Sequence, residues 1–265
     1  MSKLILVLLI SLLSITSYPQ SGWIISEQIR GEDVDDVAET TLFIQDNKIR
    51  SSDKDHSLIV DLVEWQLTIL EHKSKGYWKG TPSLYLEYVK RFTLDLIKEE
   101  MAGANDHDMP YLEALYEDLI MDIRMGSDVV SFIGELSVEV IMTNELDRIL
   151  EYPVNHFIVY LDGRRVEEVW LSRDIKFRDI YDYAKFREFK DEMSWGYLFQ
   201  DYRSSEKYIH LLNQGLPMKT VEFDEVAEIS ITRVIAVENT VIDEVVFKIP
   251  LHYRQMESPP ETLLF

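Results

Sequence analysis

The sequence predicts an α+β protein with an antiparallel β-sheet and helices on one face. Two observations favour this class. Apolar and polar residues alternate with period two near the start, in the middle and at the end of the chain, and two stretches with helical periodicity separate these regions. Runs of strands separated by helices are typical of antiparallel sheets covered by helices. With 265 residues, 46% of them hydrophobic, the chain has ample material for one large domain.

The chain opens with a segment typical of exported proteins. Lys3 precedes ten apolar or small residues, 4–13, and the following residues up to Ser21 are mostly polar. The apolar run is too short for a membrane-spanning helix, which needs about 20 residues. Residues 1–21 are therefore predicted to be a signal peptide. The mature chain is expected to be a soluble, exported protein of the bacterial periplasm, without a stable membrane anchor.

The first third of the mature chain, residues 23–79, reads as a meander of five or six short strands. Within it, Asp46 and Asn47 separate the strand 41–45 from the strand 48–51. Asp and Asn tolerate the positive φ that tight hairpin turns require, so this pair predicts a hairpin.

Two helices are expected next. Thr81 provides an N-cap and Pro82 a first helical residue whose missing N–H costs nothing. Gly103 is predicted to end this helix, and a second one is expected from Pro110 to Gly126. In the first helix the spacing of the apolar residues predicts one apolar face, formed by Tyr85, Val89, Phe92 and Leu96.

Strand periodicity returns at Glu135, and Asp162-Gly163 between two alternating apolar runs predicts a second hairpin. Further along the chain the pattern predicts two helices, at 174–195 and 204–213. The last elements expected are three strands, at 219–223, 229–237 and 241–249. The tail 258–265 contains Pro259 and Pro260 and is expected to be flexible.

Several of these segments resemble the superfamily of the outer-membrane lipoprotein carrier and its lipid-binding relatives. The resemblance lies in the strand and turn patterns of residues 43–50, 59–62, 73–78, 157–171, 215–220 and 246–253. It implies a strongly curved antiparallel half-barrel, with the helical insertions packed on its concave side, formed by a single domain at 22–257. It also implies an apolar concave face of the kind that receives acyl chains in characterised relatives.

Composition argues against several other classes of function. The 27 Lys and Arg against 48 Asp and Glu leave a formal net charge of −21, which repels nucleic acids and anionic membranes. The absence of cysteine excludes disulfides, thiolate nucleophiles and Cys-ligated zinc. There is no G-x-S-x-G motif and no glycine-rich phosphate loop. No cofactor is predicted.

Three polar features are interpreted as having no catalytic or metal-binding role. Asp106-His107-Asp108 is expected to be a solvated loop, because adjacent side chains in a loop seldom converge on a metal. Glu167 and Glu168 are neighbours on a strand and should point to opposite faces. His72 and His156 are expected at strand ends or on the surface. The chain therefore has no predicted catalytic residue and no predicted metal site.

The candidate site is an apolar cleft between sheet and helices. Its expected lining residues are Trp65, Leu67, Ile69, Tyr85, Val89, Phe92, Leu96, Phe157 and Val159. The sequence leaves open whether these side chains pack against each other as core or line a cleft that binds a ligand.

The sequence is therefore compatible with three functions. The first is non-catalytic binding of a hydrophobic, lipidic or acylated ligand in this cleft. The second is an envelope interaction module with a filled core, whose sheet face or edge receives a protein partner. The third is an exported hydrolase that uses a carboxylate pair, which needs two carboxyls in one cleft.

Overall fold

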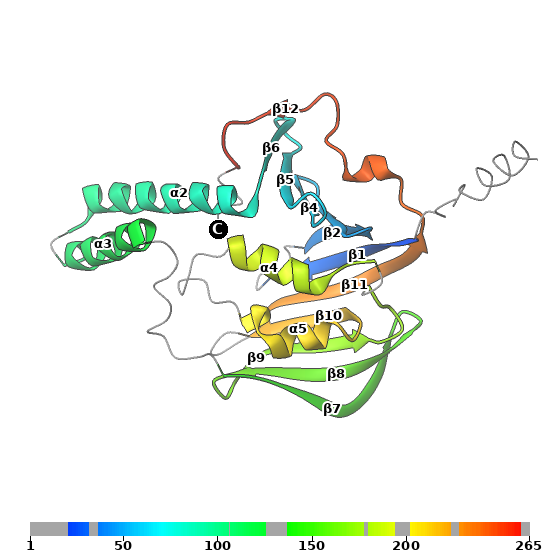
Figure 1. The fold of residues 1–265 in the computed structure, drawn as a ribbon. Coiled ribbons are helices and arrows are strands. Elements are labelled where there is room, and N and C mark those ends of the chain that lie inside the picture. The colour runs from blue at the N-terminus through cyan, green and yellow to red at the C-terminus, as the bar shows by residue number, and fades with distance from the viewer. Residues whose placement is uncertain are drawn as a thin grey trace, which may run out of the picture.

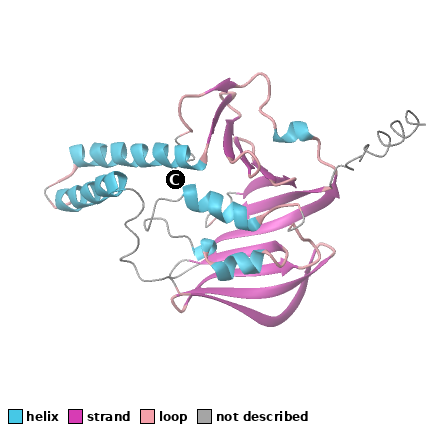
Figure 2. Ribbon diagram, in the orientation of Figure 1, coloured by secondary structure: helices cyan, strands magenta, loops and turns pink. Residues whose placement is uncertain are grey.

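The computed structural model describes residues 21–31, 37–105, 107–125, 137–177, 180–193, 202–223 and 228–260. Residues 1–20 of the predicted signal peptide, Asp106, Gly126 and the end of the tail at 261–265 lie outside the described residues. The described chain forms one large, mostly antiparallel sheet with helices (Figures 1 and 2).

The first meander and the helices that follow it lie where the sequence predicts them. The strands are β1 (Gly22–Arg30), β2 (Val37–Gln45), β3 (Lys48–Ser52), β4 (His56–Asp61), β5 (Gln66–Glu71) and β6 (Gly76–Gly80). They are followed by α2 (Pro82–Gly103) and α3 (Met109–Met125). The Thr81 side chain accepts the Leu84 N–H, which confirms the predicted N-cap.

The second half of the chain contributes the other strands and two helices that cover the sheet. The elements are β7 (Val138–Ile149), β8 (Tyr152–Leu161), β9 (Arg164–Ser172), α4 (Tyr183–Met193), the 3₁₀ turn η2 (Tyr202–Ser204), α5 (Glu206–Leu212), β10 (Leu216–Phe223), β11 (Glu228–Thr240), the 3₁₀ turn η3 (Glu244–Phe247) and β12 (Arg254–Gln255).

The strand order is β12-β6-β5-β4-β3-β2-β1-β11-β10-β9-β8-β7. Two meanders meet where β1 pairs with β11, and among the described strands the short β12 alone is parallel to its neighbour. The sheet is open, with β12 and β7 at its edges. Figure 1 shows the strand direction turning strongly between β7–β11 and β4–β6, as expected for a twisted sheet.

Both predicted hairpin turns are confirmed by their backbone angles. Asp46 and Asn47 have φ values of 51° and 60°, and Asp162 and Gly163 have φ values of 52° and 78°. Two successive residues with positive φ match the right-handed twist of the flanking strands. These turns therefore set the register of β2 with β3 and of β8 with β9.

The helices do not all lie on the sheet. In Figure 1, α4 and α5 lie in front of the strands, whereas the α2–α3 hairpin extends away from them. Phe189 of α4 packs edge-on against Trp65, and α5 packs on β8 and β9 through Tyr208 and Leu211. The far part of α2 instead packs against α3, which buries Leu94 and Ile97 with Leu119.

The predicted helix at 174–195 is wrong over its first turns. Helix α4 begins at Tyr183, and the Asp182 carboxylate accepts the backbone N–H groups of Ala184 and Lys185. Before this cap Ile175 and Phe177 are buried in the core, and Phe177 packs edge-on against Trp23 of β1. The backbone N–H groups of Ile180 and Tyr181 donate to the Phe177 carbonyl, so a tight turn precedes α4.

The predicted third strand at 241–249 is also wrong. Its residues instead contain η3, whose cap Asp243 accepts the Val245 N–H. The β1–β11 ladder ends at the pair Gly22 and Thr240, so residues after Thr240 have passed the end of their described neighbouring strand. Without a partner strand, the local preference of Asp243 for a turn decides the structure.

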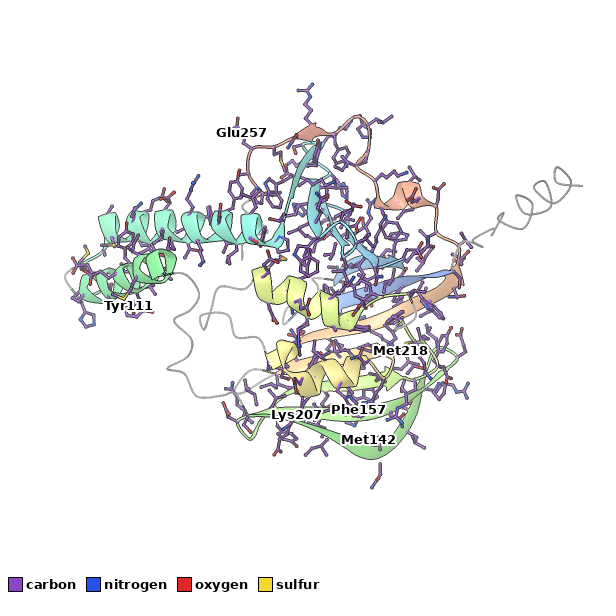
Figure 3. The ribbon with its side chains drawn as sticks, viewed as in Figure 1. Tyr111, Met142, Phe157, Lys207, Met218 and Glu257 are labelled. Carbon is purple, nitrogen blue, oxygen red and sulfur yellow. The ribbon has the colours of Figure 1, made fainter. Side chains whose placement is uncertain are left out.

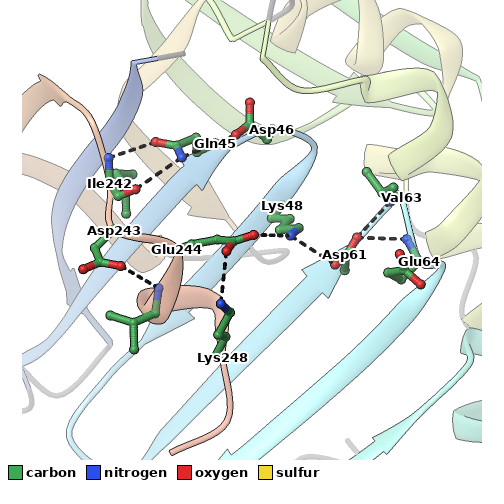
Figure 4. A network of polar contacts seen from close by, with 11 residues as sticks. Gln45, Asp46, Lys48, Asp61, Val63, Glu64, Ile242, Asp243, Glu244 and Lys248 are labelled. Carbon is green, nitrogen blue, oxygen red and sulfur yellow. Dashed lines mark hydrogen bonds and ion pairs between the residues drawn. The ribbon is translucent and has the colours of Figure 1, made fainter. Parts of the chain in front are cut away.

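Residues 241–257 form a C-terminal strap that runs back across the first meander. Gln45 holds its start: the side-chain oxygen accepts the Ile242 N–H at 2.9 Å, and the side-chain amide donates to the Ile242 carbonyl at 3.3 Å (Figure 4). Arg50 donates to the Val246 carbonyl at 2.7 Å. Further along, the Met256 N–H donates to the Tyr77 carbonyl at 2.7 Å beside β12.

Replacing Gln45 by leucine is expected to lower the free energy of unfolding by about 2 kcal/mol, because it leaves two buried backbone groups of Ile242 without partners. Urea denaturation measures the change. Glu244→Gln is the matched control, because this exposed strap residue pairs with Lys48 and Lys248 at the surface. Equal stabilities of the Gln45→Leu variant and the wild type would contradict the anchoring role.

Candidate functional site: a cleft between α5 and the β7–β8 hairpin

A cleft of about 640 Å³ lies between α5 and the hairpin β7–β8. Its apolar lining comes from both sides, from Val140, Met142 and Phe157 of the strands and from Ile209 and Leu211 of α5. Its polar lining consists of Arg187, Glu206, Lys207, His210, Asn213 and Gln214. Figure 3 shows the labelled side chains Met142, Phe157 and Lys207 close together in this region.

The floor of the cleft belongs to the hydrophobic core. Phe157 and Leu211 are buried in one cluster with Val159, Val169 and Tyr208. Met142 pairs with Phe157 across the two strands, yet 53% of its surface is exposed. The cleft therefore has the exposed side chain of Met142 at its surface and the buried side chains of Phe157 and Leu211 at its floor.

The residues at both ends of α5 hold the helix beside the sheet. Ser205 caps its start by accepting the Tyr208 N–H. At the other end Gly215 brings the chain against β9, and a Cβ at this position would lie 1.9 Å from the Ser172 carbonyl oxygen. A glycine after the helix thus allows α5 to turn directly into β10.

A buried network of ion pairs joins the turn η2, which precedes α5, to the strands β9 and β10. Glu167 of β9 is 1% exposed, and its carboxylate accepts hydrogen bonds from Arg203 at 3.2 Å and Tyr202 at 3.3 Å. Arg203 also pairs with Glu222 of β10 at 2.8 Å. Burial raises the pKa of Glu167, and the Arg203 charge acts in the opposite direction. Buried charges need such partners, so η2 is held to β9 and β10.

The nine predicted lining residues are divided among different parts of the core. Leu67 and Ile69 are buried in the main cluster, with Trp65 and Tyr85 packed against it. Val89 and Phe92 pack with α3, whereas Phe157 and Val159 pack with α5. Leu96 is a half-buried residue of α2. Of the nine, Phe157 lines the cleft beside α5.

The sequence did not single out the other lining residues. Lys207, His210 and Gln214 recur at spacings of three and four, which places them on one face of α5 and the turn that follows it. The spacing could have identified this polar face of α5 from the sequence. It could not have shown that the face lies beside β7, because that contact depends on long-range packing.

His156 is not the surface or strand-end residue that the sequence suggests. It lies within β8, is 6% exposed and stacks on Trp170 with ring centroids 4.3 Å apart. Lys219 covers the same indole, 4.1 Å from its ring. Glu145 and Glu168 approach the imidazole at 3.2 and 3.4 Å. Cross-strand packing, invisible in the local sequence, buries this histidine.

Glu167 and Glu168 point to opposite faces of β9, as predicted. Glu167 meets Arg203 beneath α5, whereas Glu168 pairs with Arg165 at 2.8 Å and lies near His156. These two carboxylates do not share a cleft, so they do not form the pair that the hydrolase hypothesis needs.

A second cavity, about 760 Å³, lies at the tip of the α2–α3 hairpin. Its lining includes Glu99, Glu100, His107 and Asp108 beside the apolar Tyr111 and Leu112. Asp106 of the sequence motif lies outside the described residues, and among those that are described no three His, Asp or Glu side chains are grouped to hold a metal ion. Of its two large apolar side chains, Leu112 is buried and Tyr111 is exposed.

The comparisons with known proteins show no family for this chain. None of the described helices is long and apolar enough to cross a membrane. No protein-family model matches the chain, and no curated protein matches it.

Among solved structures, PNGF-II matches in two crystal forms, with a TM-score of 0.38 in each and identities of 11% and 10%. Each match covers 91% of this chain, but the chain spans only 32% of the length of PNGF-II. A LolA superfamily protein from Nitrosomonas europaea has a TM-score of 0.29 at 8% identity, over 87% of this chain and 91% of the other. These likenesses are too weak to assign the chain to either family.

Proposed function

We propose that this protein is an exported, periplasmic, non-catalytic binding protein that holds a hydrophobic or lipidic ligand in the cleft between α5 and β7–β8. The observation that carries the proposal is the continuity of the cleft with the core, since Phe157 and Leu211 belong to both. In this proposal the sheet curves around α4 and α5 as a half-barrel, and its helix-covered side faces the ligand.

The size of the cleft and the energy of burial agree with such a ligand. A volume of about 640 Å³ falls within the range of about 300–1,000 Å³ that small-molecule sites occupy. Each buried methylene contributes about 0.8 kcal/mol, so ten contribute about 8 kcal/mol. That gain exceeds the lower end of the cost of immobilising a ligand, about 4–15 kcal/mol, and falls short of the upper end. An alkyl chain of about ten carbons or more, helped by further contacts, is therefore the occupant that this balance favours.

Replacing Met142 by aspartate is expected to weaken binding of an alkyl ligand at least about tenfold, because it places a charge on the accessible apolar wall. Ile141→Asp is the matched control. Ile141 is the adjacent residue, is 48% exposed and points to the other face of β7. Both variants add the same charge to the same strand, so their difference isolates the cleft.

Native mass spectrometry of the chain from Gly22 onward, purified after export from a bacterial host, measures the bound ligand. A mass increment that extracts as lipid and is lost in Met142→Asp, but retained in Ile141→Asp, is the expected result. An unloaded protein that stays unloaded after incubation with phospholipid vesicles would contradict the proposed function.

The open edge of β7 favours a second candidate, the addition of a strand from an envelope protein. At this edge Leu146 is 81% exposed and Ile141 is 48% exposed. Unpaired backbone groups on an edge strand can pair with another chain. Ile141→Asp then becomes the test variant, expected to lower partner capture from envelope extracts while ligand binding is unchanged. Unchanged capture would contradict this candidate.

A further inference from the structure

We propose that the cleft selects ligands with one small anionic head group on one alkyl chain, and that Arg187 and Lys207 recognise this head group, with His210 beside them. The inference rests on the proposed binding function and names its ligand class. Its basis is the charge of the cleft lining, which differs in sign from the rest of the protein.

Cationic and basic side chains from different elements line the same cleft. Arg187 comes from α4, whereas Lys207 and His210 come from α5. A further cation adjoins them, because Arg173 donates to the side-chain oxygen of the lining residue Gln214 at 2.8 Å. Among the lining residues that the structure describes, Glu206 is the single carboxylate.

This arrangement is unexpected for the overall charge of the chain. The protein has 48 acidic and 27 basic residues and a formal net charge of −21. The described residues of the cleft lining, with Arg187 and Lys207 against Glu206, have a formal charge of +1 with His210 neutral. A positively charged lining beside apolar side chains is complementary to an amphiphile with a negative head.

The nearby partners of these cations leave capacity for a ligand. Lys207 donates one hydrogen bond to the Val138 carbonyl, at 2.6 Å, but an ammonium group has three N–H donors. Asp191 interacts electrostatically with Arg187 from one turn further along α4 and is not part of the cleft lining. A guanidinium has five donors in a planar fork that suits carboxylate or phosphate oxygens.

The strongly negative surface limits the charge that the ligand can carry. Long-range repulsion opposes the approach of polyanions, whereas a head group with one or two negative charges is offset locally by the two cations Arg187 and Lys207. Carboxylate and phosphate monoester heads share the chemistry that these two cations recognise. The apolar floor accepts the alkyl chain that either head carries.

Isothermal titration calorimetry with decanoate, decyl phosphate and the neutral 1-decanol tests the inference. The wild type is expected to bind at least one of the two anions about tenfold or more tightly than decanol, the effect of one charge-assisted hydrogen bond. The double variant Arg187→Gln/Lys207→Gln is expected to lose this preference and to bind decanol unchanged. Whichever of the two anions binds more tightly identifies the head group.

Three controls separate recognition from folding. Lys185→Gln removes a positive charge from an exposed position of α4 outside the cleft lining, and the preference should remain. Lys207→Arg keeps the charge and should also retain it. Arg187→Gln alone avoids the contact of Lys207 with Val138 and should weaken binding of the anions but not of decanol.

The outcomes distinguish the two proposals. Equal binding of the anions and decanol to the wild type would overturn the anionic head group and leave the proposed ligand-binding function intact. A preference for the anions that persists in the double variant would overturn the role of Arg187 and Lys207. Failure of all three compounds to bind would overturn the proposed function itself.

Discussion

Replacing Gly215 by alanine is expected to destabilise the protein by about 3 kcal/mol and to open the packing of α5 on the sheet. A Cβ at this position would lie 1.9 Å from the backbone oxygen of Ser172 and 2.7 Å from its carbonyl carbon. No side-chain rotation can relieve a clash with backbone atoms. The chain can respond only by moving α5 or the start of β10 away from β9.

Gly103→Ala provides the control for the Gly215 substitution. Gly103 is the last residue of α2, and no other atom lies within 4 Å of an added Cβ. Alanine favours the helix, so this variant should be as stable as the wild type or slightly more stable. Urea denaturation compares the free energies of unfolding of the Gly215→Ala and Gly103→Ala variants. Similar stabilities for both variants would show that the close approach at Gly215 is not needed.

The Gly215 variant also bears on the cleft. Leu211 of α5 forms part of both the cleft wall and the core cluster that contains Phe157. Displacement of α5 should therefore reduce ligand binding even in the fraction that stays folded. Binding that survives the loss of stability unchanged would place the ligand elsewhere in the molecule.

The free energy of unfolding is expected to fall as the pH rises from about 4.5 to about 7, because of the carboxyl group of Glu27. Glu27 lies two residues after the buried Ile25 on the same face of β1, opposite the buried Val234. Burial raises the pKa of its carboxyl from 4.5 to about 7. Within this range the unfolded chain carries an ionised Glu27, whereas the folded protein keeps it protonated.

The folded state therefore binds more protons in this range, and its stability falls with increasing pH. The difference between the two pKa values corresponds to about 3 kcal/mol at neutral pH and above. Glu27→Gln removes the titrating group and keeps its shape. The variant should be about 3 kcal/mol more stable than the wild type at pH 8 and nearly equal to it at pH 4.

Chemical denaturation between pH 4 and pH 8 measures this difference. Glu39→Gln is the control, because it removes one carboxyl from an exposed position on the adjacent strand β2. It corrects for the change in net charge of a strongly acidic protein. If both variants follow the same stability profile, the burial of Glu27 has no specific effect on folding.

The features that were predicted correctly are those that a few neighbouring residues determine. Asp46-Asn47 and Asp162-Gly163 adopt the positive φ of their turns, and Thr81 with Pro82 starts α2. Their energies come from backbone preferences and from hydrogen bonds within four residues. Alternation of apolar residues likewise identified β1 to β6, because one face of each strand must be buried.

The errors occur where distant segments compete for the same backbone. Residues 174–182 have an apolar pattern compatible with a helix, but Ile175 and Phe177 are buried in the core cluster before α4 begins at Tyr183. Residues 241–249 read as a strand, yet the neighbouring strand β1 begins only at Gly22. Local propensity is a weak preference, and tertiary packing overrides it at such places.

By itself, then, the sequence determined the α+β class, the turns that align the hairpins and the start of α2. It could not place the cleft, because the wall of the cleft joins β7 and β8 to α5, more than 40 residues further along the chain. The tertiary structure decided that Leu67 is core and that Phe157, Arg187 and Lys207 line one cleft. The physical reason is that burial and charge clustering depend on contacts between distant segments, whereas turns and caps depend on neighbours.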